Sequence, residues 1–98
     1  MTMSKVTVVA KVTAKREHVE SVRRELLGLI APTREEEGCI EYHLHQDNQD
    51  PAVFIFYETW QSESCLSAHM ESAHFKSYVC AIDGMLAEKT VHRMTKIG

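Results

Sequence analysis

Glu58, Trp60 and His69 are the residues whose types and spacing could do chemistry. Glu58 and Trp60 are two positions apart in a segment typical of a strand, so both side chains point to one face of a sheet. His69 follows on a helical segment and can reach the same space. An imidazole held by a carboxylate has a fixed tautomer and raised basicity, which suits proton transfer near neutral pH. A purely structural Glu58–His69 hydrogen bond beneath the helix is the alternative interpretation.

Aromatic side chains surround this candidate acid–base pair. Trp60 offers a flat apolar wall with one N–H donor, which suits a planar aromatic ligand. Phe56 shares its strand face, and His74 and Phe75 begin the next helical segment. These residue types favour a pocket between a sheet and its helices.

Metal and cofactor motifs are not evident. His43 and His45 have a legitimate metal spacing on one strand face, but no third ligand lies nearby in sequence. The acidic run of residues 35–37 is interpreted as a solvated helix end. On one continuous helix His69 and His74 would be about 140° apart, which makes a poor ligand pair. No nucleotide-binding glycine motif is present, so we predict neither a metal nor a cofactor.

The hydrophobic pattern predicts the elements that must position these residues. Strands are expected where β-branched or aromatic residues alternate, and helices where apolar residues recur every three or four positions. Pro32 should kink the first helix, and Gly38 should end it. Ser62 should cap the second helical region, which should break near Ser72. The apolar residues keep helical spacing as far as Leu86. The expected order is strand Lys5–Thr13, a helix from Arg16, strand Cys39–Gln46, strand Val53–Trp60, two helical segments and strand Thr90–Lys96.

This β-α-β-β-α-β order predicts an α+β, ferredoxin-like subunit with an antiparallel four-stranded sheet. The third strand, Val53–Trp60, is apolar on both parities, so both of its faces should be covered. Helices can cover only one face of the sheet. We therefore expect a homodimer in which two copies stack through their sheet faces.

Composition narrows the possible partners. The chain has 98 residues and a formal net charge of −3, which predicts one domain over residues 1–98 and gives no electrostatic case for nucleic acid. Apolar runs are too short to span a bilayer, and no secretory signal is recognised. Three cysteines without CxxC spacing favour reduced thiols, so a cytoplasmic location is expected.

Several short motifs, taken together, resemble the antibiotic biosynthesis monooxygenase (ABM) domain family. They are the runs 33–42 (TREEEGCIEY), 56–60 (FYETW), 68–69 (AH) and 72–75 (SAHF). The resemblance implies a dimeric α/β barrel. The family includes quinol and anthrone monooxygenases that use no metal or flavin, an isomerase of a phosphorylated dicarbonyl, and haem-degrading relatives. Haem binding is disfavoured because the first strand lacks the asparagine that those relatives use.

The resemblance places Glu58, Trp60 and His69 at pocket-lining positions, with His74 and Phe75 close by. It implies a cofactor-independent monooxygenase for a small quinol or polyphenol, in which His69 is the base and Glu58 orients it. Substrate-binding residues would be Trp60, Phe56, His74 and Phe75. Two alternatives stay open. One is a proton-transfer isomerase of a small dicarbonyl, with Arg34 or Arg93 as phosphate anchors, and the other is a ligand-binding dimer without turnover.

Overall fold

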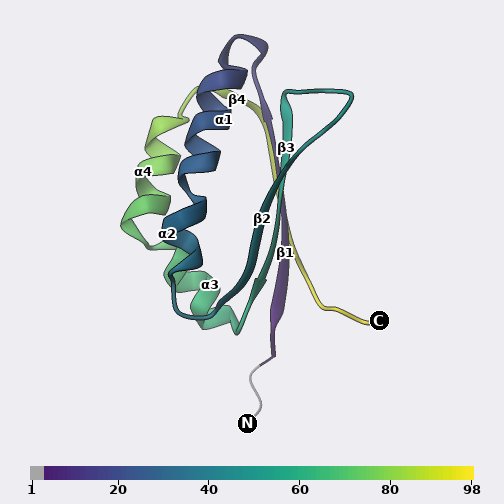
Figure 1. The fold of residues 1–98 in the computed structure, drawn as a ribbon, viewed down its shortest axis with the longest axis vertical. Coiled ribbons are helices and arrows are strands. Elements are labelled where there is room, and N and C mark those ends of the chain that lie inside the picture. The colour runs from purple at the N-terminus through teal and green to yellow at the C-terminus, as the bar shows by residue number, and fades with distance from the viewer. Residues whose placement is uncertain (1–3) are drawn as a thin grey trace.

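A computed structural model describes residues 4–98 and shows an antiparallel sheet covered by helices on one face (Figure 1). The strand order is β2-β3-β1-β4, which is the ferredoxin-like arrangement expected from the sequence. The elements are β1 Val6–Ala14, the 3₁₀ helix η1 Arg16–His18, α1 Val19–Gly28, α2 Ile30–Arg34, β2 Cys39–Gln46, β3 Val53–Trp60, α3 Glu63–Met70, α4 Ala73–Ala81 and β4 Leu86–Met94.

The central strands carry the core because one parity of each faces the helices. On β3 the buried set is Phe54, Phe56, Glu58 and Trp60. The register places Val8 of β1 opposite Glu58, so the carboxylate is flanked by an apolar strand. A buried carboxylate in this position is costly unless a donor meets it.

The first helical region is broken three residues before its proline. Pro32 lies inside α2, and α1 ends at Gly28, four residues earlier. Proline has no N–H to donate to the carbonyl four positions back, so the helical ladder is interrupted there. The kink expected around Pro32 is thereby confirmed, with the break itself at Leu29.

Serine caps divide the second helical region at the expected place. The Ser62 Oγ accepts a hydrogen bond from the Cys65 backbone N–H, and the Ser72 Oγ accepts one from Phe75. The Ser72 hydroxyl also donates to the His69 carbonyl over 2.6 Å, which ties the end of α3 to the start of α4. His69 and His74 therefore lie on two different helices.

The last strand begins earlier than the sequence pattern suggests. Helical spacing through Leu86 predicted a longer helix and a strand over Thr90–Lys96, and both boundaries are wrong. Helix α4 ends at Ala81, and β4 covers Leu86–Met94. Gly84 has a φ of 79°, a left-handed conformation that turns the chain back before any further helical turn forms.

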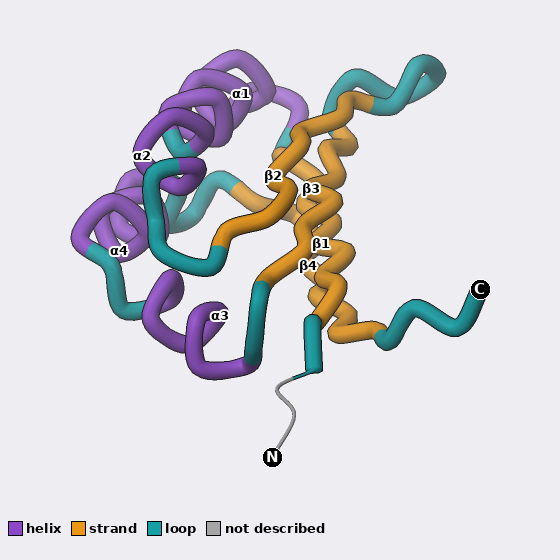
Figure 2. The backbone as a smooth tube through the Cα atoms, turned by 60° about the horizontal axis from the view of Figure 1, so that its bottom comes forward, coloured by secondary structure: helices purple, strands orange, loops and turns teal. Residues whose placement is uncertain are grey.

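The sheet face opposite the helices is uncovered in the single chain (Figure 2). On β3 this face carries the half-buried Val53 and Ile55, then Tyr57, which is 39% exposed, and the polar Thr59 at the end of the strand. Within the described residues, no helix is long and apolar enough to cross a membrane.

Gly38 should be harder to replace than Gly84, although both have positive φ. A Cβ at Gly38 would collide with the Cys65 side chain, whereas nothing lies within 4 Å of one at Gly84. Gly84→Ala should cost about 1–2 kcal/mol through backbone strain alone. We expect Gly38→Ala to cost more in urea unfolding followed by far-UV circular dichroism, and Cys65→Ala to recover part of the difference. Equal costs for the two glycines would contradict this packing.

Candidate active site

A mostly apolar pocket lies between the sheet and the helices. Five of its lining residues can ionise: Tyr42, Glu58, His69, Tyr78 and Lys89. The remaining lining residues are apolar and come from β1, β3, β4 and the helices: Val8, Ala10, Val12, Leu29, Phe56, Leu66, Met70, Phe75 and Val91. Such a lining suits a ring-shaped ligand held by few polar contacts.

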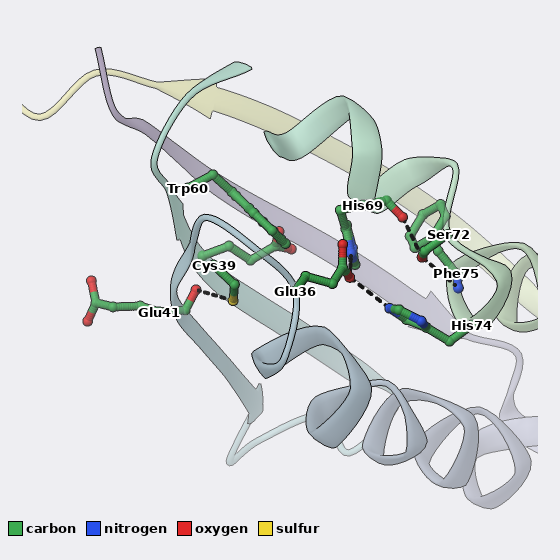
Figure 3. A network of polar contacts seen from close by, with 9 residues as sticks. Glu36, Cys39, Glu41, Trp60, His69, Ser72, His74 and Phe75 are labelled. Carbon is green, nitrogen blue, oxygen red and sulfur yellow. Dashed lines mark hydrogen bonds and ion pairs between the residues drawn. The ribbon is translucent and has the colours of Figure 1, made fainter. Parts of the chain in front are cut away.

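One carboxylate oxygen joins two histidines beside this pocket (Figure 3). The Glu36 Oε2 is 2.7 Å from Nδ1 of His69 and 2.7 Å from Nε2 of His74. The side chains are 3% exposed for His69, 15% for Glu36 and 26% for His74. The chain segment before β2, the end of α3 and the start of α4 thus meet at one oxygen atom.

This arrangement fixes which nitrogen of His69 is free. A carboxylate can only accept hydrogen bonds, so Nδ1 of His69 must carry the proton it donates to Glu36. In the neutral ring Nε2 is then an unprotonated acceptor. Glu36 does not line the pocket but His69 does. Nε2 is the ring nitrogen that Glu36 leaves free, so it is the His69 nitrogen available to a ligand in the pocket.

The His69 ring is held in place by aromatic neighbours. Its centroid lies 4.8 Å from that of Trp60 and 5.0 Å from that of Phe75. Burial lowers the pKa of His69 below its usual value, and the nearby Glu36 carboxylate opposes part of that effect. A neutral imidazole with a free Nε2 is the form that can accept a proton.

Glu58 is the second polar group in the pocket, and its partner is Trp60. The Trp60 indole Nε1 donates to the Glu58 Oε1 over 2.8 Å, and Glu58 is only 4% exposed. Burial raises the pKa of Glu58 to about 7, although the indole hydrogen bond lowers it, and Glu36 raises it further. Glu58 therefore changes charge near neutral pH.

Of the six predicted site residues, four line the pocket and two lie outside its lining. Glu58, Phe56, His69 and Phe75 line the pocket. Trp60 lies behind it, against His69 and Glu58. His74 does not line the pocket but bonds to Glu36, and its ring centroid lies 6.0 Å from that of His69.

The carboxylate that bonds to His69 is that of Glu36 rather than that of Glu58, which bonds to Trp60 instead. The acidic run containing Glu36 was interpreted as solvated, yet Glu36 is mostly buried between two histidines. The signal that could have revealed it was the pairing of a helix break at Ser72 with a turn at Gly38, which brings distant segments together.

The same three residues are the described cluster that could hold a metal. The donor atoms of Glu36, His69 and His74 lie within 4.8 Å of one another. Their 2.7 Å separations are hydrogen-bond lengths, so both imidazole N–H groups would have to lose their protons to a cation. Within residues 4–98, His43 and His45 form no such cluster.

The fold and the pocket define an α+β ferredoxin-like chain in which Glu58 and His69 line one mostly apolar pocket. Residues 5–80 match the family model for antibiotic biosynthesis monooxygenase, so the chain belongs to the ABM family.

Similar proteins agree with this membership. The chain is 31% identical to the uncharacterized protein sll1783 of Synechocystis over 69% of this chain, and the match spans 46% of that relative. It is 25% identical to the probable quinol monooxygenase YgiN of Escherichia coli, over 87% of this chain and 91% of YgiN. The crystal structure of PA3566 from Pseudomonas aeruginosa superposes with a TM-score of 0.94 at 31% identity, covering 100% of this chain and 99% of PA3566.

Stability should depend on pH through Glu58. Because its folded pKa of about 7 exceeds the ordinary 4.5, the folded state binds more protons between these values. Stability therefore falls as pH rises through that window, by about 3 kcal/mol in total. Glu58→Gln should remove this loss, so its stability relative to the wild type should grow from pH 4.5 to 8.5 in urea unfolding.

Far-UV circular dichroism is the appropriate probe, since Trp60 emission would respond directly to its Glu58 partner. Glu37→Gln, an exposed glutamate next to Glu36, is the charge-matched control. A stability difference between Glu58→Gln and the wild type that stays constant with pH would show that the pKa of Glu58 is not raised in the folded protein.

Proposed function

We propose that the protein is a cofactor-independent monooxygenase that oxidises a small quinol or polyphenol with O₂. The observation that carries the proposal is the free Nε2 of His69 at the end of an apolar pocket, held by Glu36. ABM family membership and the similarity to YgiN, named as a probable quinol monooxygenase, support it. We take residues 1–98 as one domain of this family, of which the structure describes 4–98.

The chemistry requires only a base, a shielded pocket and O₂. Nε2 of His69 removes the proton of a quinol hydroxyl, and the resulting anion transfers one electron to O₂. The semiquinone and superoxide combine into a ring hydroperoxide, which loses water to give a hydroxyquinone. One quinol and one O₂ thus yield one hydroxyquinone and one water, and the substrate supplies all the electrons. Excluding bulk water keeps the radical pair together.

Each polar residue has a defined part in this scheme. Glu36 is a positioning residue that keeps the His69 proton on Nδ1. His74 holds the same carboxylate oxygen from the outer side and is the more exposed of the two rings. Glu58, in its protonated form, donates a proton to the oxygen that leaves as water. Phe56 and Phe75 contact the substrate ring.

A proton-transfer isomerase is the second candidate, because Glu58 and His69 form an acid–base pair on one pocket. The two arginines expected to bind a substrate phosphate in such an isomerase are engaged elsewhere. Arg34 donates to the Tyr42 carbonyl over 2.9 Å, and Arg93 donates to Glu63 over 2.9 Å. Turnover of a dicarbonyl under anaerobic conditions would favour this candidate over the oxygenase.

Removing the base should abolish O₂ consumption. With a panel of naphthohydroquinones and an oxygen electrode, His69→Gln should lower kcat by roughly 10²–10⁴-fold. Glu36→Gln should lower kcat by roughly tenfold or more, because the ring loses its fixed tautomer. Glu37→Gln should match the wild type. Uptake no faster than protein-free autoxidation across the panel would refute the oxygenase, and ligand binding without any turnover would identify a binding protein.

We propose further that the uncovered sheet face pairs with a second copy of the chain. The half-buried Val53 and Ile55 and the exposed Tyr57 would otherwise present an apolar patch to water. Sedimentation velocity should show a dimer for the wild type and a monomer for Ile55→Glu. Leu27→Glu, which places the same charge at a 45% exposed position on α1, should stay dimeric. A wild-type monomer would disprove this pairing.

A further inference from the structure

One cation stands at the mouth of the pocket. Lys89 and Val91 line the pocket from β4. Lys89 pairs with Val12, a buried residue on the helix side of β1, so Lys89 and Val91 share that side of the sheet. Both are exposed, which places them at the open end of the pocket.

Lys89 forms no ion pair within the described residues, whereas neighbouring cationic side chains pair with glutamates. On the same two strands, Lys11 forms an ion pair with Glu88 at 3.8 Å, and Arg93 forms one with Glu63 at 2.9 Å. Within residues 4–98, no acidic side chain lies within ion-pair distance of Lys89. Its charge is therefore available to a ligand.

The other ionisable lining residues do not supply a competing cation. Burial lowers the pKa of His69 and raises the pKa of Tyr78 to about 12. The Glu58 carboxyl is occupied by the Trp60 indole. An apolar pocket with an acid–base pair inside and one free ammonium group at its mouth fits a ligand that is apolar at one end and anionic at the other.

The strand register gives the distance between Glu58 and Lys89, which both line the pocket. Glu58 pairs with Val8, and Lys89 pairs with Val12, four residues along β1 and two strands away from β3. At about 3.4 Å per residue and about 4.8 Å per strand, their Cα atoms are roughly 17 Å apart. The two side chains span only part of this distance, so a ligand that reaches both carries its ring near Glu58 and its anionic group near Lys89.

We infer that the substrate is a quinol with an anionic substituent at the end remote from the reacting hydroxyl, and that Lys89 is the residue that selects the anion. Carboxylate, sulfonate and phosphate share this chemistry. The quinol part rests on the proposed function, whereas the preference for an anion rests on the pocket alone.

Calorimetric binding of naphthol and its sulfonate and carboxylate derivatives tests the inference without turnover. The wild type should bind both anionic probes roughly fivefold more tightly than neutral naphthol, and added salt should reduce the difference. Lys89→Met should bring the ratio to about one, and Lys89→Glu should reverse it. Lys5→Met is the matched control, because it removes an exposed lysine of the same charge just before β1 and should leave the ratio unchanged.

Each outcome separates this inference from the proposed function. Equal binding of neutral and anionic probes by the wild type would overturn it, as would no binding of any probe. A preference that survives in Lys89→Met would overturn it too. A Lys89-dependent preference without O₂ uptake from any naphthohydroquinone would support the anion site and refute the oxygenase.

Discussion

The arrangement of the site depends on one shared oxygen atom. The Glu36 Oε2 accepts from both His69 and His74, and these three residues come from three separate segments. Two local features make this possible: the left-handed turn at Gly38, which follows Glu36, and the serine cap at Ser72, which separates the two histidines. Because the carboxylate can only accept, the shared oxygen also sets the tautomer of His69.

Burial then determines what the polar groups of the pocket can do. It lowers the pKa of His69, which leaves a neutral base, and raises the pKa of Glu58 to about 7, which leaves a carboxyl able to give a proton. The Trp60 indole binds Glu58 and its ring lies against His69, so one aromatic residue supports both groups. The same desolvation that stabilises the apolar core thus shifts the pKa values of both groups, and the proposed function uses them as acid and base.

Much of this could be read from the sequence, because local patterns determine local structure. The alternation of Cys39–Gln46 and the apolar run of Val53–Trp60 predicted both strands with their bounds, Ser62 was predicted as a cap, and the helix break was predicted near Ser72. The role of Glu36 could not be read, since an acidic run before glycine has the same pattern whether it is solvated or folded onto two histidines. The apolar spacing wrongly predicted helical structure through Leu86, because spacing alone does not show that the chain reverses its direction at Gly84.

The tautomer of His69 is the most direct test of the account. Two-bond ¹⁵N–¹H correlation of histidine-labelled protein near neutral pH reports which ring nitrogen carries the proton. The account predicts that the neutral His69 ring carries it on Nδ1, and that Glu36→Gln disturbs this state while Glu37→Gln does not. A His69 ring protonated on Nε2, or one indifferent to Glu36→Gln, would contradict the shared-carboxylate arrangement and with it the assignment of His69 as the base.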